Sequence, residues 1–158
     1  MAVDLIGPWT VTVNDVELEF KALICIDPVT NLAEAIQIQN KTSRHVADQF
    51  RNYWLSKYPK PNKCIQDNVG EFIGAPFLEL LQAAGIQSRP TTVKNPQANA
   101  ICKRLYLTMG NILTRTNPPN DEKQAEQIID NALATCIHVT QSAINQTMQT
   151  SPRALVFQ

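Results

Sequence analysis

The stretch VELEFKALICI, residues 16–26, alternates apolar and polar side chains over its first half and is continuously apolar over its second. Alternation is typical of a half-buried strand, and an unbroken apolar run is typical of a strand covered on both faces. The pattern therefore predicts a strand that enters the core. Apolar residues 2–6 and 32–38 predict neighbouring strands, the first of them broken by GP at 7–8, so the chain opens as a meander of three strands.

Helical and strand patterns alternate after this meander. Apolar spacing predicts four helices, at about 43–57, 75–84, 98–115 and 121–147, and two short strands, at 63–66 and 86–89. Ser43 is placed to cap the first helix, and the polar stretch 91–99 predicts a loop. Three strands, then alternating helix and strand, then helices predict an α/β fold with a mixed sheet.

Length and charge limit the possible functions. A chain of 158 residues, 44% of them hydrophobic, fits one domain over residues 1–158. No apolar run approaches the roughly 20 residues of a membrane span, so we expect no membrane partner. Fourteen basic residues balance fourteen acidic ones, yet no acid occurs between Glu79 and Asp121. The basic residues of that stretch either create a local positive field that attracts phosphate or lie on an ordinary solvated helix face.

The spacing of the cysteines does not match that of a metal-binding site. Cys25, Cys64, Cys102 and Cys136 lie more than 30 residues apart from one to the next, without a CxxC pair. Cys25 and Cys136 lie in apolar patterns, so we interpret both as small buried hydrophobic residues. Free cysteines favour a reducing, intracellular compartment, the nucleus if a host expresses the chain.

Acidic residues at strand ends are the first candidates for chemistry, because carboxylates on rigid strands bind divalent cations. Asp67 directly follows the strand at 63–66. Asp4 lies inside the first apolar strand, where an unpaired acid is costly and a function would explain it. Asp27 also ends a strand, but DPVT is an ordinary turn sequence, and we favour that structural interpretation.

Three segments carry a family resemblance. Residues 3–8 (VDLIGP), 66–72 (QDNVGEF) and 95–104 (NPQANAICKR) resemble, in the same order, the active-site segments of retroviral and LTR-retrotransposon integrase catalytic cores. The resemblance covers nearly the whole chain. It implies an RNase H-like fold with a five-stranded mixed sheet flanked by helices, and a function in DNA integration by metal-dependent polynucleotidyl transfer.

The resemblance also implies a site. Asp4 and Asp67 correspond to the family's two catalytic aspartates, which bind metal. The position of the catalytic glutamate, reached after 35 intervening residues, is occupied by Lys103. Such enzymes use two Mg²⁺ or Mn²⁺ ions roughly 3.5–4 Å apart. Gln66 and Val69 also depart from the family pattern, and Glu71 is a poor substitute for the missing acid because the family has an acid there too.

Replacing the glutamate by lysine changes the formal charge of the trio from −3 to −1. A like charge about 4 Å from a metal ion costs on the order of 4 kcal/mol at an effective dielectric of 20. We therefore expect at most one weakly bound ion and impaired catalysis. The alternative is a non-catalytic DNA-binding or protein-assembly module on the same scaffold. Lys103 is expected either to form a buried ion pair with Asp4 and Asp67 or to face solvent.

The partners that the resemblance implies are DNA and a second copy of the chain. The expected DNA-binding residues are Lys94, Asn95, Gln97, Asn99 and Arg104. Without the zinc module and basic C-terminal domain of complete integrases, this domain alone is expected to bind DNA weakly and in a salt-sensitive way. A homodimer is expected through the helices at 43–57 and 121–147.

Overall fold

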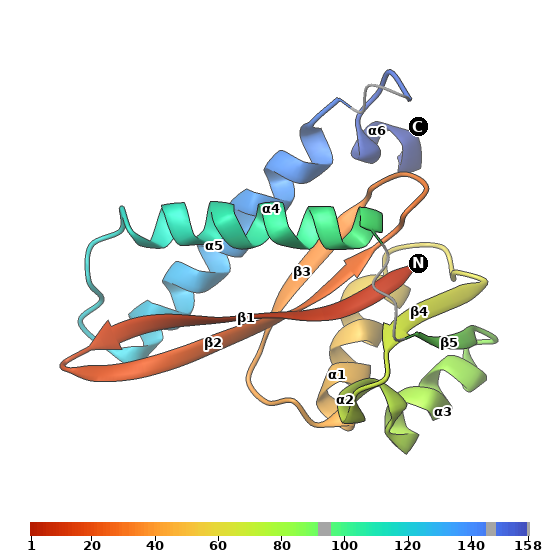
Figure 1. Cartoon of the computed structure of the whole chain (residues 1–158), viewed down its shortest axis with the longest axis horizontal. Helices are drawn as coiled ribbons and strands as arrows, with labels where there is room; N and C mark the ends of the chain where they lie inside the picture. The colour runs from red at the N-terminus through yellow and green to blue at the C-terminus, as the bar shows by residue number, and fades with distance from the viewer. Residues whose placement is uncertain (92–95, 145–147, 158) are drawn as a thin grey trace.

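The structure, a computed structural model, describes residues 1–91, 96–144 and 148–157, and only the backbone of 96–99. Its centre is a five-stranded sheet in the order β3-β2-β1-β4-β5 (Figure 1). The strands are β1 (Ala2–Val13), β2 (Val16–Ile26), β3 (Ala33–Ile38), β4 (Lys63–Asp67) and β5 (Gln87–Thr91). β1 pairs antiparallel with β2, as β2 does with β3, whereas β4 is parallel to β1 and to β5. The predicted mixed sheet and opening meander are confirmed.

β1 is longer than the sequence pattern predicted. The expectation that the Gly7–Pro8 pair ends the strand is wrong, because the pairing with β2 shifts register between Ile6 and Trp9 and then continues. Proline cannot donate a ladder hydrogen bond, and a bulge accommodates it. Gly7 has φ 109°, and a Cβ there would lie 2.8 Å from the carbonyl oxygen of Phe20. Only glycine fits this close approach of two strands.

Helices cover both faces of the sheet. They are α1 (Ser43–Phe50), the π-helix η1 (Arg51–Leu55), α2 (Gly70–Ile73), α3 (Ala75–Ala83), α4 (Pro96–Leu113), α5 (Glu122–Ser142) and α6 (Pro152–Val156). One core packs β1 and β2 against α4 and α5, and the other packs the opposite face against α1, η1 and α3. In the described part of the chain, no helix has the length and apolar character needed to cross a membrane.

The helix predicted at 43–57 differs in two respects. Its α-helical part ends at Phe50 and continues as η1, which buries Trp54. Ser43 does not cap it: Thr42 is the N-cap, and its side chain accepts a hydrogen bond from the backbone N–H of His45. The Ser43 hydroxyl instead accepts one from the N–H of Phe77, 3.2 Å away, in the first turn of α3. The side chain therefore joins two helices.

Candidate active site on β1, β4 and α4

The two candidate aspartates lie on neighbouring parallel strands. Ala2 of β1 is the register partner of Ile65 of β4. Two residues farther along each strand are Asp4 and Asp67, so the register brings them to the same level on strands about 4.8 Å apart. Side chains two apart on a strand share a face. Since Ala2 and Ile65 both belong to the core under α4 and α5, the aspartates share that face of the sheet.

The local surroundings of the two acids differ. Asp4 is half-buried, and its Oδ1 accepts a hydrogen bond from the backbone N–H of Leu5 at 2.8 Å. Asp67 is half-buried at the last position of β4, where it is the register partner of Thr91. Both carboxylates are thus held on strand backbone at the edge of a core. This is a rigid arrangement of the kind that divalent-cation sites use.

Helix α4 is anchored over β1 by two aromatic residues. The ring of Tyr106 stacks on that of buried Trp9, with centroids 5.8 Å apart, and the Tyr106 hydroxyl donates to the Pro8 carbonyl at 3.5 Å. Cys102 and Leu105 are buried in the core beneath the helix. α4 runs along β1 in the same direction as the strand (Figure 1).

These contacts determine the position of Lys103. It lies three residues before Tyr106, which is about 60° around the helix and roughly 4.5 Å back along its axis. Because Cys102 and Leu105 are buried beneath the helix, this rotation turns Lys103 farther from the core than Tyr106, which is itself 46% exposed.

The Lys103 ammonium faces solvent. The side chain is exposed, and none of the ion pairs found among residues 1–91, 96–144 and 148–157 involves it. Lys103 therefore does not form the buried ion pair with Asp4 and Asp67 that was one expectation. It faces solvent, which was the other. The physical reason is the desolvation penalty, since a long amine on a helix flank keeps its charge in water when it can.

The other predicted residues divide into two groups. Arg104 is exposed on the outer side of α4. Lys94 and Asn95 lie outside the described residues, and so do the side chains of Gln97 and Asn99, whose backbone belongs to α4. Within the part of the chain that is described, no three His, Cys, Asp or Glu side chains are placed to hold a metal ion, so Glu71 does not complete a trio with the aspartates.

Asp27 performs the structural role that its turn sequence predicted. Its Oδ1 accepts from the backbone N–H of Val29 at 3.1 Å, and its Oδ2 accepts from the Thr30 hydroxyl at 2.7 Å. None of the four cysteines forms a disulfide, and all four are buried, as Cys25 and Cys136 were expected to be.

The sequence marked Gln66 only as a departure from the family pattern, and its structural role was not predicted. Gln66, only 1% exposed, donates from Nε2 to the Ser88 hydroxyl at 2.6 Å and so joins β4 to β5 directly before Asp67. Its Oε1 has no hydrogen-bond partner among the residues that the structure describes. The period of two on a strand places Gln66 on the face opposite Asp67, which is the available sequence signal for its burial.

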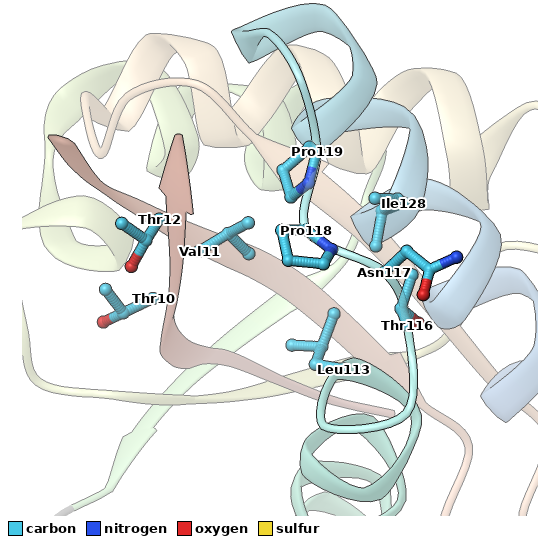
Figure 2. Close-up of a pocket in the computed structure, with 9 residues that line it drawn as sticks. All are labelled: Thr10, Val11, Thr12, Leu113, Thr116, Asn117, Pro118, Pro119 and Ile128. Carbon is cyan, nitrogen blue, oxygen red and sulfur yellow. The ribbon is translucent and has the colours of Figure 1, made fainter. Parts of the chain in front are cut away.

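A separate cavity of about 210 Å³ lies where the far end of β1 meets the α4–α5 connection. Thr10 and Thr12 line one side and Pro118 the other (Figure 2). None of its lining residues is titratable, so it offers no group for acid–base or metal chemistry.

Comparisons with known proteins agree with this architecture. No protein-family model matches the sequence, and no curated protein matches it. Solved structures do match. The isolated HTLV-2 integrase catalytic core domain, in complex with magnesium in a trimeric form, superimposes with a TM-score of 0.73 at 13% identity, covering 98% of this chain and 93% of that one. The chain has the fold of a retroviral integrase catalytic core.

Two further structures share this integrase-core fold. The catalytic core of BIV integrase matches with a TM-score of 0.69 at 14% identity, over 98% of this chain and 92% of that one. A chain of the simian T-cell lymphotropic virus intasome, in complex with PP2A regulatory subunit B56 gamma, matches with a TM-score of 0.77 at 13% identity over 99% of this chain. This chain spans about half of the intasome chain, 53%. The RNase H-like fold implied by the three sequence segments is thereby confirmed.

Proposed function

We propose that residues 1–158 form one integrase-derived core domain, related to DNA integration, in which polynucleotidyl transfer is impaired because Lys103 replaces the acid of the trio. The observation that carries the proposal is the parallel register of Ala2 with Ile65, from which we infer that Asp4 and Asp67, two residues farther along each strand, lie at one level. The integrase-core fold supports the same ancestry. Lys103, exposed on α4, is the residue that sets this chain apart.

The donor set does not fit a pair of divalent ions. Two carboxylates, on Asp4 and Asp67, satisfy one ion at most, and an ammonium cannot ligate a metal. The repulsion between an ammonium and a metal ion about 4 Å away is on the order of 4 kcal/mol at an effective dielectric of 20, and the lost carboxylate adds to it. Two-ion chemistry is therefore not assigned to this chain, and the expected binding is at most one weakly held Mg²⁺ or Mn²⁺.

A nicking assay on duplex DNA tests the proposal. The wild-type protein is expected to show no cleavage above background in Mn²⁺. The Lys103→Glu variant is expected to gain Mn²⁺ binding by calorimetric titration and, if the rest of the site is intact, nicking activity. Arg104→Glu is the matched control, because it introduces the same charge at the adjacent exposed position and should gain neither. Robust Mn²⁺-dependent nicking by the wild type would overturn the proposal.

The alternative function is a DNA-binding or assembly module without catalysis. It is favoured by α4 itself, which contains no acidic residue and exposes both Lys103 and Arg104. The homodimer expected through α1 and α5 is also part of this proposal. It is supported by the apolar side chain of Val139 on α5, which is 57% exposed. Sedimentation at high concentration distinguishes a dimer from a 17.6 kDa monomer.

A further inference from the structure

We infer that residues 9–13 of β1 form a free strand edge at which an extended peptide of a partner protein docks as an additional strand of the sheet. The peptide that fits this edge alternates apolar and basic residues. The free edge of β1 borders the cavity shown in Figure 2, at the end of the strand remote from Asp4. The inference therefore goes beyond the proposed function and depends neither on Lys103 nor on metal binding.

The first step is that β1 extends past its neighbour β4. Ala2 lies beside Ile65, and β4 ends at Asp67, so the described strands leave the far half of β1 with a partner on one side only, which is β2. Residues 9–13 (WTVTV) include no proline, glycine or charged residue. They thus lack the features with which proteins usually protect an exposed strand edge from pairing with another chain.

The second step is the direction of the backbone groups on this edge. The turn at residues 14–15 has φ values of 48° and 65°, which is typical of a two-residue hairpin turn. Val13 and Val16 flank this turn and form a hydrogen-bonded pair, and such pairs alternate with non-hydrogen-bonded pairs along an antiparallel ladder. The N–H and C=O groups of Thr10 and Thr12 consequently point away from β2. Among the residues that the structure describes, no backbone hydrogen bond outside the sheet involves them.

The third step is the cavity that borders the edge. It has a volume of about 210 Å³ and lies between residues 10–12 and the connection from α4 to α5. Pro118 and Pro119 belong to its opposite wall and have no N–H, so they cannot donate ladder hydrogen bonds to β1 (Figure 2). Leu113 and Ile128 add apolar surface. The cavity therefore suits an apolar side chain of an added strand, whose backbone would satisfy the edge.

The fourth step is the charge on the other face of the hairpin. Thr10 and Thr12 are the register partners of Glu19 and Glu17, and all four residues are exposed. Side chains of directly opposite residues share one face of a sheet, so two carboxylates lie beside the short threonines. Lysine or arginine side chains of an added strand would extend across the threonines towards these carboxylates. Because successive side chains alternate between faces, apolar and basic residues should alternate in the peptide.

The opposite edge of the same hairpin provides a contrast. β3 pairs with β2 only from Lys21 onwards, so the first part of β2 has a second exposed edge in the described part of the chain. Glu17 and Glu19 lie on that strand, and charged residues are a common protection against pairing. The uncharged edge of β1, which also has an apolar cavity beside it, is therefore the one that we assign to peptide docking.

A fluorescently labelled peptide of alternating valine and lysine residues is the probe, and its binding to the 158-residue chain is measured by anisotropy. Two further forms of the peptide carry backbone N-methyl groups, one on all valines and the other on all lysines. Alternate N–H groups of a strand point to opposite edges, so only one form loses the groups that face β1. That form should bind about tenfold more weakly or worse, and the other like the unmodified peptide.

Variants of the protein locate the site. Thr12→Pro removes one N–H of the free edge and should weaken binding about fivefold, the net value of one hydrogen bond. Thr12→Val is the matched control, because it changes the side chain and keeps the N–H. Glu17→Gln should also weaken binding of this basic peptide, whereas Glu79→Gln, at an exposed position on α3, should leave it unchanged. Thermal unfolding checks that each variant is folded.

Three results would overturn the inference. They are no binding of the unmodified peptide, equal binding of the two N-methylated forms, and equal affinities of Thr12→Pro and Thr12→Val. The comparison of the N-methylated forms uses the wild-type protein and so holds even where Thr12→Pro fails to fold. A dimer in sedimentation that Thr12→Pro abolishes would show that a second copy of the chain occupies the edge, and it would equally overturn docking of a partner peptide.

Discussion

The ring of Tyr106 on α4 stacks on that of Trp9 on β1, with centroids 5.8 Å apart and planes inclined by 28°. This contact ties the helix that carries Lys103 to the strand that carries Asp4. The two rings are 97 residues apart in the chain, and their stacking sets how far the helix lies along the strand. The geometry of the candidate site thus depends on a contact outside it.

Removing this contact should weaken the fold. The Tyr106→Ala variant loses the aromatic stack and uncovers Trp9, and we expect the free energy of unfolding to fall by about 1–2 kcal/mol. Urea denaturation measures the change. Leu107→Ala is the control, because Leu107 is 67% exposed and its removal should change stability by less than about 0.5 kcal/mol. Equal losses in both variants would contradict a specific anchoring role for the stack.

The junction of α1 with α3 should tolerate no side chain at Gly74. A Cβ there would lie 2.5 Å from the Cβ of Ser43, so Gly74→Ala forces the two helices apart and is expected to destabilise the protein by about 1–3 kcal/mol. Gly70→Ala serves as the matched control, because nothing lies within 4 Å of a Cβ at that position. Thermal unfolding of the two variants should therefore differ clearly, and a neutral Gly74→Ala would show that the helices are packed less closely.

Alkaline pH should destabilise the protein through Tyr58. Burial, followed by the hydrogen bond that its hydroxyl donates to Glu34 Oε1 at 2.5 Å and the charge of Glu34, raises the pKa of Tyr58 well above its usual value, against a smaller opposing effect of Arg153. The unfolded chain releases this proton near pH 10, whereas the native state retains it. The stabilisation is therefore complete below about pH 10 and is lost as the pH rises further, by about 1.4 kcal/mol per pH unit.

Urea denaturation between pH 8 and pH 11 measures this dependence. Tyr58→Phe should reduce the slope of the free energy of unfolding against pH, above pH 10, by the contribution of about one proton, which is about 1.4 kcal/mol per pH unit. Tyr53→Phe, which alters a tyrosine that is 40% exposed on η1, is the control. An identical alkaline slope in wild type and Tyr58→Phe would show that the Tyr58 proton does not contribute.

The four thiols should be unreactive in the native protein. Burial raises the pKa of Cys25 and Cys136, and it raises that of Cys64 to about 12, the nearby N-terminal amine opposing the shift. Reaction with a disulfide reagent at pH 8 requires an accessible thiolate, so we expect no modification until denaturant is added and four thiols thereafter. A Leu107→Cys variant provides an exposed thiol as the positive control. Rapid labelling of the wild type would contradict the buried placement.

The strand elements were predictable where the signal is local. Alternation along residues 16–26 predicts β2 to the residue, because the period of two depends only on the strand itself and on which face is buried. The short helices α2 and α6 were not predicted, since four or five residues are too few to show a helical period. The change from α1 to η1 at Arg51 was missed as well, because both helix types bury similar apolar faces.

In the candidate site, too, some features are set by the local sequence and others by contacts between distant segments. The residue types of Asp4, Asp67 and Lys103, and the spacing between them, are properties of the sequence alone. Whether these residues meet depends on the register of Ala2 with Ile65 and on the stack of Tyr106 with Trp9, which join segments distant in the chain. The role of Gln66 in joining β4 to β5 likewise needed the partner strand.

The amino-acid sequence by itself determined the mixed α/β composition, the order of the strands along the chain and the formal charges of Asp4, Asp67 and Lys103, because each depends on residue identity or short-range periodicity. Tertiary structure alone decided that β1 continues past Gly7–Pro8, that Ser43 serves α3 instead of α1, and that Lys103 points into solvent. The physical reason is that bulges, shared hydrogen bonds and the cost of desolvating a charge are settled by neighbours far along the chain, which no local pattern encodes.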